Sequence, residues 1–510
     1  MKRFLPILFL LPTVLFAQLS QRQTMYASVP DCNVRGFVPW QGGNVLAGYS
    51  NYGTDSSLMN LLFLNDSDNV VSHKEFNTAT HLDFMSCIIP AANGFLIGGK
   101  SSDPNFFHPQ LIRTDATGNV LWAKYIDNTS FWHGQIIRIL PNGNNFSMYT
   151  FAETPTNDLF RIETDASGNF SPGIKSVPNI PMSFRVLDAE RFYSSLASSH
   201  ILCGHGNFNS STTRGGLLMK TNPSGVEWCK HITAGGNFKN DIVDVITTSG
   251  EDSYSVFVCE NMPGNQYSTI VMKFDSLGNK IWAKQLALAN GSLNGCSIVK
   301  TNDIFIASYD NLLNAYITQI TEAGVVIRTQ KWLPSSAGGA TGLNLSTYAN
   351  GILFTGMLNN NYFVARLDAD ATGCNFVNTN LINVTTPVTV LTDIPFTNTP
   401  FTATAVSEPV TYSSVSYTES LICNGVGVEE IESGKVLQIY PVPASNRINI
   451  NSSIPTNNFS KLEIFNAFGN CVLTRGYDRN EIDVSAFASG MYLLKITTAG
   501  KIYGSRFIKE

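Results

Sequence analysis

The chain has 510 residues, of which 43% are hydrophobic and 14% are charged, and its formal net charge is −5. A chain of this length can bury a large core and is expected to contain more than one domain. The low charge and the 40 glycines favour a β-rich exported protein over a cytosolic helical enzyme, and the absence of a basic stretch argues against a nucleic-acid partner.

The N-terminus has the pattern of a secretory signal peptide. Lys2 and Arg3 precede the apolar run Phe4–Phe16, and the small residue Ala17 follows. A membrane anchor is the alternative, but a bilayer-spanning helix needs about 20 apolar residues, and this run is shorter. The sequence therefore predicts a signal peptide over residues 1–17, and no later stretch predicts a transmembrane segment.

A pattern of alternating apolar residues around a D-x-x-G core recurs seven times in the next part of the chain. The clearest copies are LIRTDATGNVLWAK (Leu111–Lys124) and IVMKFDSLGNKIWAK (Ile270–Lys284). The residue after the turn glycine, or its equivalent, falls at positions 69, 119, 169, 226, 279, 325 and 374. This regular spacing indicates a repeat architecture rather than seven active sites.

Each copy predicts a β-hairpin, because the apolar alternation is that of a half-buried strand. Asp115 and Asp275 are expected to accept backbone hydrogen bonds in the turn, while Gly118 and Gly278 supply a positive φ. Another strand pair with an Asn-Gly turn precedes several copies, so one repeat contains four antiparallel strands.

Seven four-stranded units predict an all-β fold, a seven-bladed β-propeller over residues 18–385, with a linear solenoid as the alternative. Two segments are candidates for the strand that closes the ring, namely Thr24–Val29 and the segment after Cys374.

The repeat resembles that of the PQQ-type β-propeller superfamily. The residues that carry the resemblance are Asp115, Gly118, Trp122, Asp275, Gly278 and Trp282. The resemblance implies the fold alone, since no adjacent cysteines match the vicinal disulfide of the quinoprotein enzymes, and no cofactor is predicted. A lysine lies two residues after each of these tryptophans, which would suit a sugar platform, but the regular placement favours an indole packed between blades.

Motifs for other chemistries are weak. There is no phosphate-binding loop, nucleophile elbow or zinc-binding helix motif. Asp368–Gly373 (DADATG) begins like a calcium loop, but Thr379 stands where the twelfth-position carboxylate is required. His133 and His205 have no partner at ligand spacing. The sequence therefore predicts no catalytic residue and no metal site.

The segment after the repeats has its own composition. No Lys or Arg lies between Arg366 and Lys435, and the segment is rich in Thr and Val. Residues 386–434 are expected to form an extra β segment packed on the propeller, ending in a linker at Asn424–Gly434. Cys374 and Cys423 bracket most of it. They are predicted to form a disulfide, which an exported protein can keep and which contributes about 4 kcal/mol for a loop of this size.

Residues 435–510 predict a small β-sandwich of short alternating strands separated by glycine turns. They resemble the type A C-terminal sorting domain of the type IX secretion system of Bacteroidota. The residues that carry the resemblance include Tyr440, Pro441, Pro443, Gly490, Tyr492, Lys495 and Lys509. The family most often has Asn where this chain has Val442. A generic immunoglobulin-like adhesive domain is the alternative.

This resemblance implies a type IX export partner and a secreted or outer-surface location, reached after signal-peptide cleavage and outer-membrane translocation. Release and surface attachment both stay open. The expected function is non-catalytic binding of a glycan or protein, and the loops around Ile180–Thr213 are the first candidate surface, because the interval between repeats is longest there. The alternatives are a secreted hydrolase or lyase with a propeller active site and a structural surface-coat protein.

Overall fold

The computed structural model describes the chain from residue 23 to residue 510 with gaps. The segments outside the description are 1–22, 28–32, 42, 51–56, 79–81, 103–106, 128–133, 153–157, 181, 192–198, 209–213, 235–237, 249–251, 262–265, 290, 335–338, 349–350, 415–417, 424–436, 453–458, 467–470, 477–479 and 499–500. The predicted signal peptide and the predicted linker at Asn424–Gly434 lie outside the described residues. Two compact units divide the chain, Met1–Gly425 and Val426–Glu510.

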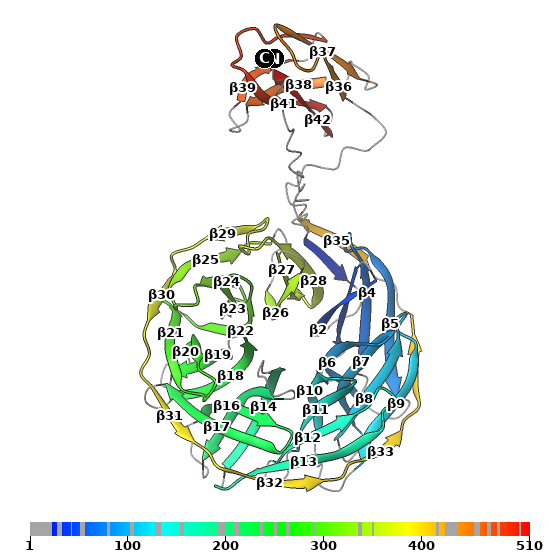
Figure 1. Ribbon diagram of the computed structural model, residues 1–510, viewed down its shortest axis with the longest axis vertical. Coiled ribbons are helices and arrows are strands. Elements are labelled where there is room, and N and C mark those ends of the chain that lie inside the picture. Colours follow the sequence, from blue (N-terminus) through cyan, green and yellow to red (C-terminus); the bar gives the residue numbers. More distant parts are fainter. Residues whose placement is uncertain are drawn as a thin grey trace, which may run out of the picture. The chain divides into compact units, whose positions relative to one another are not determined.

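The first unit is a seven-bladed β-propeller, as predicted, and its blades surround a common axis (Figure 1). Blade 1 contains β2 (Asn33–Trp40), β3 (Gly43–Ser50), β4 (Leu58–Asn65) and β5 (Val70–Thr78). Blade 2 contains β6 (Leu82–Ala91), β7 (Gly94–Ser102), β8 (Phe107–Asp115) and β9 (Val120–Asp127). Blade 3 contains β10 (Gln135–Asn142), β11 (Asn145–Ala152), β12 (Asp158–Thr164) and β13 (Phe170–Pro178). Blade 4 contains β14 (Met182–Arg191), β15 (His200–Phe208), β16 (Arg214–Asn222) and β17 (Gly225–Ala234). Blade 5 contains β18 (Phe238–Thr247), β19 (Ser253–Asn261), β20 (Gln266–Phe274) and β21 (Lys280–Leu288). Blade 6 contains β22 (Leu293–Lys300), β23 (Ile304–Asp310), β24 (Ala315–Ile320) and β25 (Val326–Trp332).

The seventh blade contains strands from both ends of the unit. Its first three strands are β26 (Ala340–Tyr348), β27 (Gly351–Leu358) and β28 (Asn361–Leu367), and the fourth is the N-terminal β1 (Gln23–Ala27). β1 pairs antiparallel with β28, with Met25 opposite Phe363. The first of the two ring-closing alternatives therefore supplies the fourth strand of this blade.

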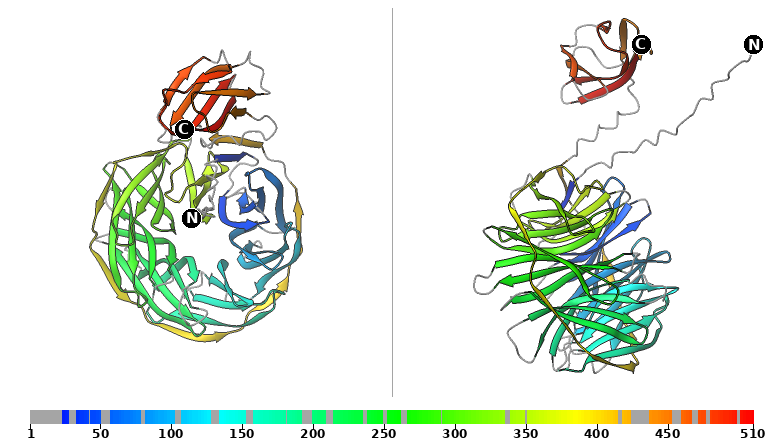
Figure 2. Two further views of the ribbon diagram at one scale, coloured as in Figure 1. Left: turned by 45° about the horizontal axis from the view of Figure 1, so that its top comes forward. Right: turned by 60° about the vertical axis from the view of Figure 1, so that its left-hand side comes forward.

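The segment after Cys374 supplies a fifth strand to every blade. Its strands are β29 (Phe376–Asn378), β30 (Ile382–Thr385), β31 (Thr389–Asp393), β32 (Phe396–Phe401), β33 (Thr404–Ser407), β34 (Val410–Ser413) and β35 (Thr418–Cys423). They pair in turn with β25, β21, β17, β13, β9, β5 and β1, so this belt passes blades 6, 5, 4, 3, 2, 1 and 7. Figures 1 and 2 show the belt on the outer rim of the ring, mostly in yellow.

Polar side chains, of which Glu408 is buried, anchor the belt. The carboxylate of Glu408 accepts hydrogen bonds of 2.9 Å each from Ser101 and Gln110 in blade 2. Asn398 exchanges hydrogen bonds with the backbone of Val226 in blade 4 and accepts one from Ser176 in blade 3. Asn398 thus joins blades 3 and 4 through its side chain.

The hydrophobic core lies between successive blades. One cluster joins Val45 and Phe63 of blade 1 to Ile97 and Ile112 of blade 2, all of them buried. Each fully buried side chain of this kind contributes about 1.5–3 kcal/mol relative to an exposed one. A blade therefore depends on its neighbours for stability.

The D-x-x-G turns form as predicted from their local chemistry. The Asp115 carboxylate accepts the backbone N–H groups of Thr117 at 2.8 Å and Asn119 at 2.9 Å. Gly118 has a φ of +81°, in the left-handed region that favours glycine. Asp275 and Gly278 make the equivalent turn in blade 5.

The tryptophans of the repeat lie against the turn of the next blade. An added Cβ on Gly168 would lie 2.8 Å from the Trp122 ring, and one on Gly324 would lie 3.0 Å from the Trp282 ring. The indole N–H of Trp282 also donates to the carbonyl of Glu322 at 3.0 Å. In the same way Lys124, two residues after Trp122, donates to the Gly168 carbonyl at 2.7 Å.

Replacing Gly168 by alanine is expected to destabilise the propeller by about 1–3 kcal/mol, because it adds both backbone strain and a contact with Trp122. Gly143 has a φ of +61° but nothing within 4 Å of an added Cβ, so Gly143→Ala isolates the backbone term of about 1 kcal/mol. Urea unfolding followed by tryptophan fluorescence measures both. Equal losses would contradict the packing role of Trp122.

The cysteines are consistent with a disulfide at the start of the belt. Cys374 is disulfide-bonded. Five described cysteines are free, namely Cys87, Cys203, Cys229, Cys296 and Cys471. The side chain of Cys423 lies outside the description, as do those of Cys32 and Cys259. The pairing of Cys374 with Cys423 stays a prediction. It is supported by Gln23, which pairs in register with Cys423 and whose side chain donates to the Cys374 carbonyl.

The second unit is a small β-sandwich, as predicted. One sheet contains β36 (Leu437–Tyr440), β37 (Arg447–Ser452) and β40 (Glu481–Asp483), and the other contains β38 (Phe459–Asn466), β39 (Cys471–Arg475), β41 (Gly490–Thr498) and β42 (Lys501–Lys509). Buried residues of both sheets, including Ile448 and Leu494, form one core. Among the described residues, no helix has the length and apolarity that a membrane crossing requires.

The residues of the predicted sorting motif lie in three parts of this unit. Pro441 and Pro443 follow cis peptide bonds after β36, and the next residue, Ala444, donates its N–H to Ile508 at 2.7 Å. The motif is thereby joined to β42, the strand that contains Lys509. On β41, Tyr492 stacks on Phe507 of β42, with ring centroids 5.4 Å apart, and Lys495 lies 3.4 Å from Glu463.

Candidate functional site

The innermost strand of each blade carries a β-bulge. The register shifts lie between Val34 and Gly36, Met85 and Cys87, Ile136 and Arg138, Val186 and Asp188, Ile242 and Asp244, Gly295 and Ser297, and Thr341 and Asn344. A bulge redirects side chains and frees backbone groups. The residues after the bulges occupy equivalent positions around the ring, yet they differ in chemistry from blade to blade.

Four of these positions form a polar chain across blades 3 to 6. Arg138 lies 3.0 Å from the Asp188 carboxylate, and Asp188 is adjacent to Asp244. The hydroxyl of Ser297 donates to Asp244 at 2.9 Å and accepts the backbone N–H of Leu345 in blade 7 at 3.1 Å. The chain therefore links five blades through their inner strands.

One of the two carboxyl groups of this chain, that of Asp244, has a raised pKa. Burial, the charge of Asp188 and a hydrogen bond between the two side chains raise the pKa of Asp244 well above its usual range. Asp244 also accepts the backbone N–H groups of Val245 and Ile298 at 2.8 Å each. A buried carboxyl group with a raised pKa beside a second carboxyl group is an arrangement that acid–base enzymes use, although structural networks produce it too.

A second polar cluster lies between blades 4 and 5. His205 of β15 is directly opposite Arg185 of β14, so the two side chains point to the same face of the sheet. Arg214 of β16 lies 3.0 Å from Nδ1 of His205 and forms a bidentate ion pair with Asp241 of β18. Arg185 is exposed, whereas the His205 side chain is 16% exposed.

His205 is held neutral in this cluster. Burial and the positive charges of Arg214 and Arg185 lower its pKa to about 3. Because the Arg214 guanidinium donates to Nδ1, the ring proton lies on Nε2. His205 is therefore a hydrogen-bond donor at Nε2 throughout the neutral pH range, not a general base.

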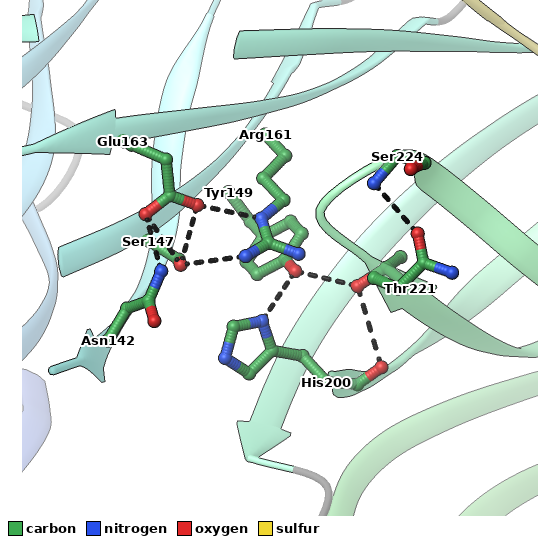
Figure 3. Close-up of polar contacts among 9 residues, drawn as sticks. Asn142, Ser147, Tyr149, Arg161, Glu163, His200, Thr221 and Ser224 are labelled. Atoms are coloured by element: carbon green, nitrogen blue, oxygen red, sulfur yellow. Dashed lines mark hydrogen bonds and ion pairs between the residues drawn. The ribbon is translucent and has the colours of Figure 1, made fainter. Parts of the chain in front are cut away.

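A third network lies between blades 3 and 4, and its central residues Tyr149, His200 and Thr221 are buried. Figure 3 shows the hydroxyl of Tyr149 between Nδ1 of His200 at 2.7 Å and the hydroxyl of Thr221 at 2.6 Å. Beside it, Arg161 donates to Glu163 at 2.8 Å. Burial raises the pKa of Tyr149 to about 12. Tyr149 and His200 have no exposed surface, so this network joins blades and does not face a ligand.

The residues singled out by the repeat do not converge on a site. Asp115, Gly118 and Trp122 lie at a turn of blade 2, and their counterparts lie at the same place in blade 5. The calcium-like stretch is the turn after β28, where Asp368 accepts the backbone N–H groups of Asp370 and Thr372. No group of three or more His, Cys, Asp or Glu side chains in the described part of the chain is arranged to hold a metal ion.

The charged members of the first two clusters were not predicted. The stretch Ile180–Thr213 does contain Arg185 and His205, although residues 192–198 and 209–213 of it lie outside the description. Arg214 and Asp241 carry no local motif. Asp188 and Asp244 can be recognised as equivalent positions only after the blades are aligned at the β-bulges of their innermost strands.

Comparison with known families identifies the second unit. Residues 438–510 match the family described as "Secretion system C-terminal sorting domain". This match confirms the predicted sorting domain and indicates export by the type IX route to the outer surface or the medium. It also implies an interaction with the secretion machinery. No curated protein matches the sequence at a significant level.

Several solved structures are similar over most of their length. Polysaccharide lyase Uly1 is 8% identical, with 66% of this chain and 90% of that chain covered and a TM-score of 0.45. The WD40 β-propeller domain of Doa1 is 11% identical, covering 67% and 96%, with a TM-score of 0.37. The extracellular domain of a putative one-component system from B. thetaiotaomicron is 10% identical, covering 95% and 99%, with a TM-score of 0.25. Identities of this size carry no information on function.

Proposed function

We propose that this chain is an extracellular recognition protein, in which a sorting domain directs export and a propeller binds a glycan or protein ligand without chemical turnover. In this proposal residues 1–17 are a signal peptide, residues 18–385 are the propeller, residues 386–434 are the β-rich extension with its linker, and residues 435–510 are the sorting domain of a Bacteroidota protein.

One observation carries the binding proposal. The cluster of Arg185, His205, Arg214 and Asp241 lies between blades 4 and 5 and combines an exposed arginine with a histidine fixed as a neutral donor. The repeat does not explain this cluster, because the repeat residues lie in the hairpin turns or on the strands that follow them. Polar groups that differ between otherwise equivalent blades are the natural place for a specific function.

A secreted hydrolase or lyase is the second candidate, and the carboxyl pair of Asp188 and Asp244 favours it. Against this candidate, the oxygens of Asp244 already accept three hydrogen bonds, and two of them come from blade 6. Groups occupied in joining blades are poorly placed to exchange protons with a substrate. Binding is therefore the function that the geometry supports better.

The exported protein, screened against immobilised glycans and proteins, is expected to bind at least one of them reversibly and to leave it intact. Chromatography of each bound ligand after prolonged incubation measures turnover. Binding without turnover supports the proposal. Cleavage that disappears in Asp188→Asn would replace it with the enzyme hypothesis, and a screen without any binding would favour a structural surface protein.

The export part of the proposal has its own test. A reporter fused to residues Lys435–Glu510 and given a signal peptide is expected to reach the surface or the medium of a type IX-competent cell. A Tyr492→Ala fusion removes the ring that stacks on Phe507 and serves as the matched control. Retention of the unmodified fusion in the periplasm would contradict the proposed route.

A further inference from the structure

One face of blade 4 has polar side chains whose hydrogen-bond donors and acceptors have no partner among the described residues. Ser183 and Arg185 of β14 are both exposed on this face, opposite Asn207 and His205 of β15. No described residue forms an ion pair or hydrogen bond with the guanidinium of Arg185. The amide oxygen of Asn207 also meets no donor within the described part of the chain.

The charges at this face are unevenly paired. The Arg214 guanidinium is neutralised by its bidentate ion pair with Asp241. That ion pair fixes the guanidinium beside Nδ1 of His205, which in turn directs the donor at Nε2 away from Arg214. Arg185 is the cation left without an ion-pair partner among the described residues, and it lies directly opposite His205 across the β14–β15 strand pair.

From this arrangement we propose that the face is a binding site for the carboxylate of an acidic sugar unit, with Arg185 and Nε2 of His205 as the two donors. The inference rests on the proposed binding function and deepens it. An arginine guanidinium and a carboxylate match in geometry as well as in charge, and a neutral imidazole donor adds direction without a second charge to desolvate.

The number of unpaired charges selects the class of ligand. One unpaired cation suits a ligand whose anionic groups are spaced apart, because each further carboxylate would be left without a partner. The neutral group nearby, the exposed Ser183 hydroxyl, suits a sugar hydroxyl group. An acidic polysaccharide meets both conditions better than a run of acidic peptide residues does.

The test uses the exported protein, oligogalacturonate as the acidic probe and a neutral oligosaccharide of similar length as its control. Arg185→Gln is expected to weaken oligogalacturonate binding about tenfold or more, since it removes a charge-assisted hydrogen bond at an exposed position. Arg35→Gln is the matched control, because Arg35 is also an exposed arginine on an innermost strand, bonded to Tyr49 in blade 1. Titration calorimetry measures both, and thermal unfolding confirms that both variants fold.

The role of His205 is tested separately. His205→Phe is expected to weaken binding, while His205→Gln, which retains a neutral donor, restores part of it. Binding by the native protein is expected to be constant from pH 5 to 8. Burial and the positive charges of Arg214 and Arg185 hold His205 neutral over this range, against the opposing charge of Asp241, whose carboxylate lies 3.4 Å from Nδ1. A titrating histidine would instead strengthen binding as the pH falls through about 6.5.

Each other outcome has a distinct meaning. Equal weakening by Arg185→Gln and Arg35→Gln would show general electrostatic attraction and overturn the site. Binding of neutral oligosaccharides or acidic peptides alone would overturn the ligand class and leave the proposed binding function standing. Failure to bind any glycan or protein would remove the proposed function as well.

Discussion

Replacing Arg366 by methionine is expected to lower the free energy of unfolding of the propeller by about 3–5 kcal/mol. Arg366 of blade 7 forms a bidentate ion pair with Asp68 of blade 1, with Nε–Oδ2 and Nη2–Oδ1 distances of 2.8 and 2.6 Å. The two side chains are only 5% and 0% exposed. Without the guanidinium, Asp68 stays buried with an uncompensated charge at the seam between the first and last blades.

The seam contains further groups that depend on this pair. Arg366 donates to the Tyr348 hydroxyl at 2.6 Å and lies over the Tyr348 ring, and the Tyr26 hydroxyl of β1 donates to the Asp68 carbonyl at 2.5 Å. Burial lowers the pKa of Arg366, but the hydrogen bond to Asp68 outweighs it, and the pKa lies above its usual value. Arg366 is therefore charged at every physiological pH.

Thermal or urea unfolding followed by tryptophan fluorescence measures the loss, because all six tryptophans lie between residues 40 and 332 and report on the propeller alone. Asp68→Asn, which tolerates the positive φ at this position, combined with Arg366→Met is expected to cost less than the sum of the single variants. Lys300→Met breaks the more exposed pair with Glu322 and is expected to cost less than about 1 kcal/mol. Similar losses for Arg366→Met and Lys300→Met would contradict the role of the seam.

Replacing Cys374 by serine is expected to lower the free energy of unfolding by about 4 kcal/mol, the value for a closed loop of roughly 50 residues. If the partner is Cys423, the bond joins the two ends of the belt, because Cys374 precedes β29 and Cys423 ends β35. The polypeptide between them would then form a covalent hoop paired with every blade. The same unfolding measurement, with and without a reductant, detects the loss.

The pairing itself is tested by variants and by mass spectrometry of unreduced peptides. Cys423→Ser is expected to have the same effect as Cys374→Ser, and the double variant no further effect, since either change opens the same bond. A linked peptide joining Cys374 to Cys32 or Cys259 would overturn the predicted pairing.

The blades could be predicted from the sequence because their instructions are local. An Asp, a Gly three residues later and flanking alternation of apolar residues specify a hairpin within about ten residues, as the Asp115 turn shows. Seven such hairpins at regular intervals imply the ring. The sorting domain was recognisable for a similar reason, since its motifs occur in order over one short stretch.

The paths that join distant parts could not be predicted. The belt strands are short, and their own sequences do not indicate which strand, such as β5 or β25, each of them pairs with. For this reason the sequence does not distinguish the two ring-closing alternatives. Both segments contribute to blade 7, β1 as the fourth strand and β35 as the fifth. In the same way, Asp241 reaches Arg214 only because the ring places blade 5 against blade 4.

The belt also fixes the order in which a complete molecule comes into being. Val410 of β34 pairs with Thr78 of β5, so the outermost strand of the first blade is synthesised only after nearly all the rest of the propeller unit. The ribosome adds the belt after the seventh blade, and the sorting domain after the belt. A chain that carries the export address has thus already received every strand that the ring needs. Products of interrupted translation therefore lack the sorting domain.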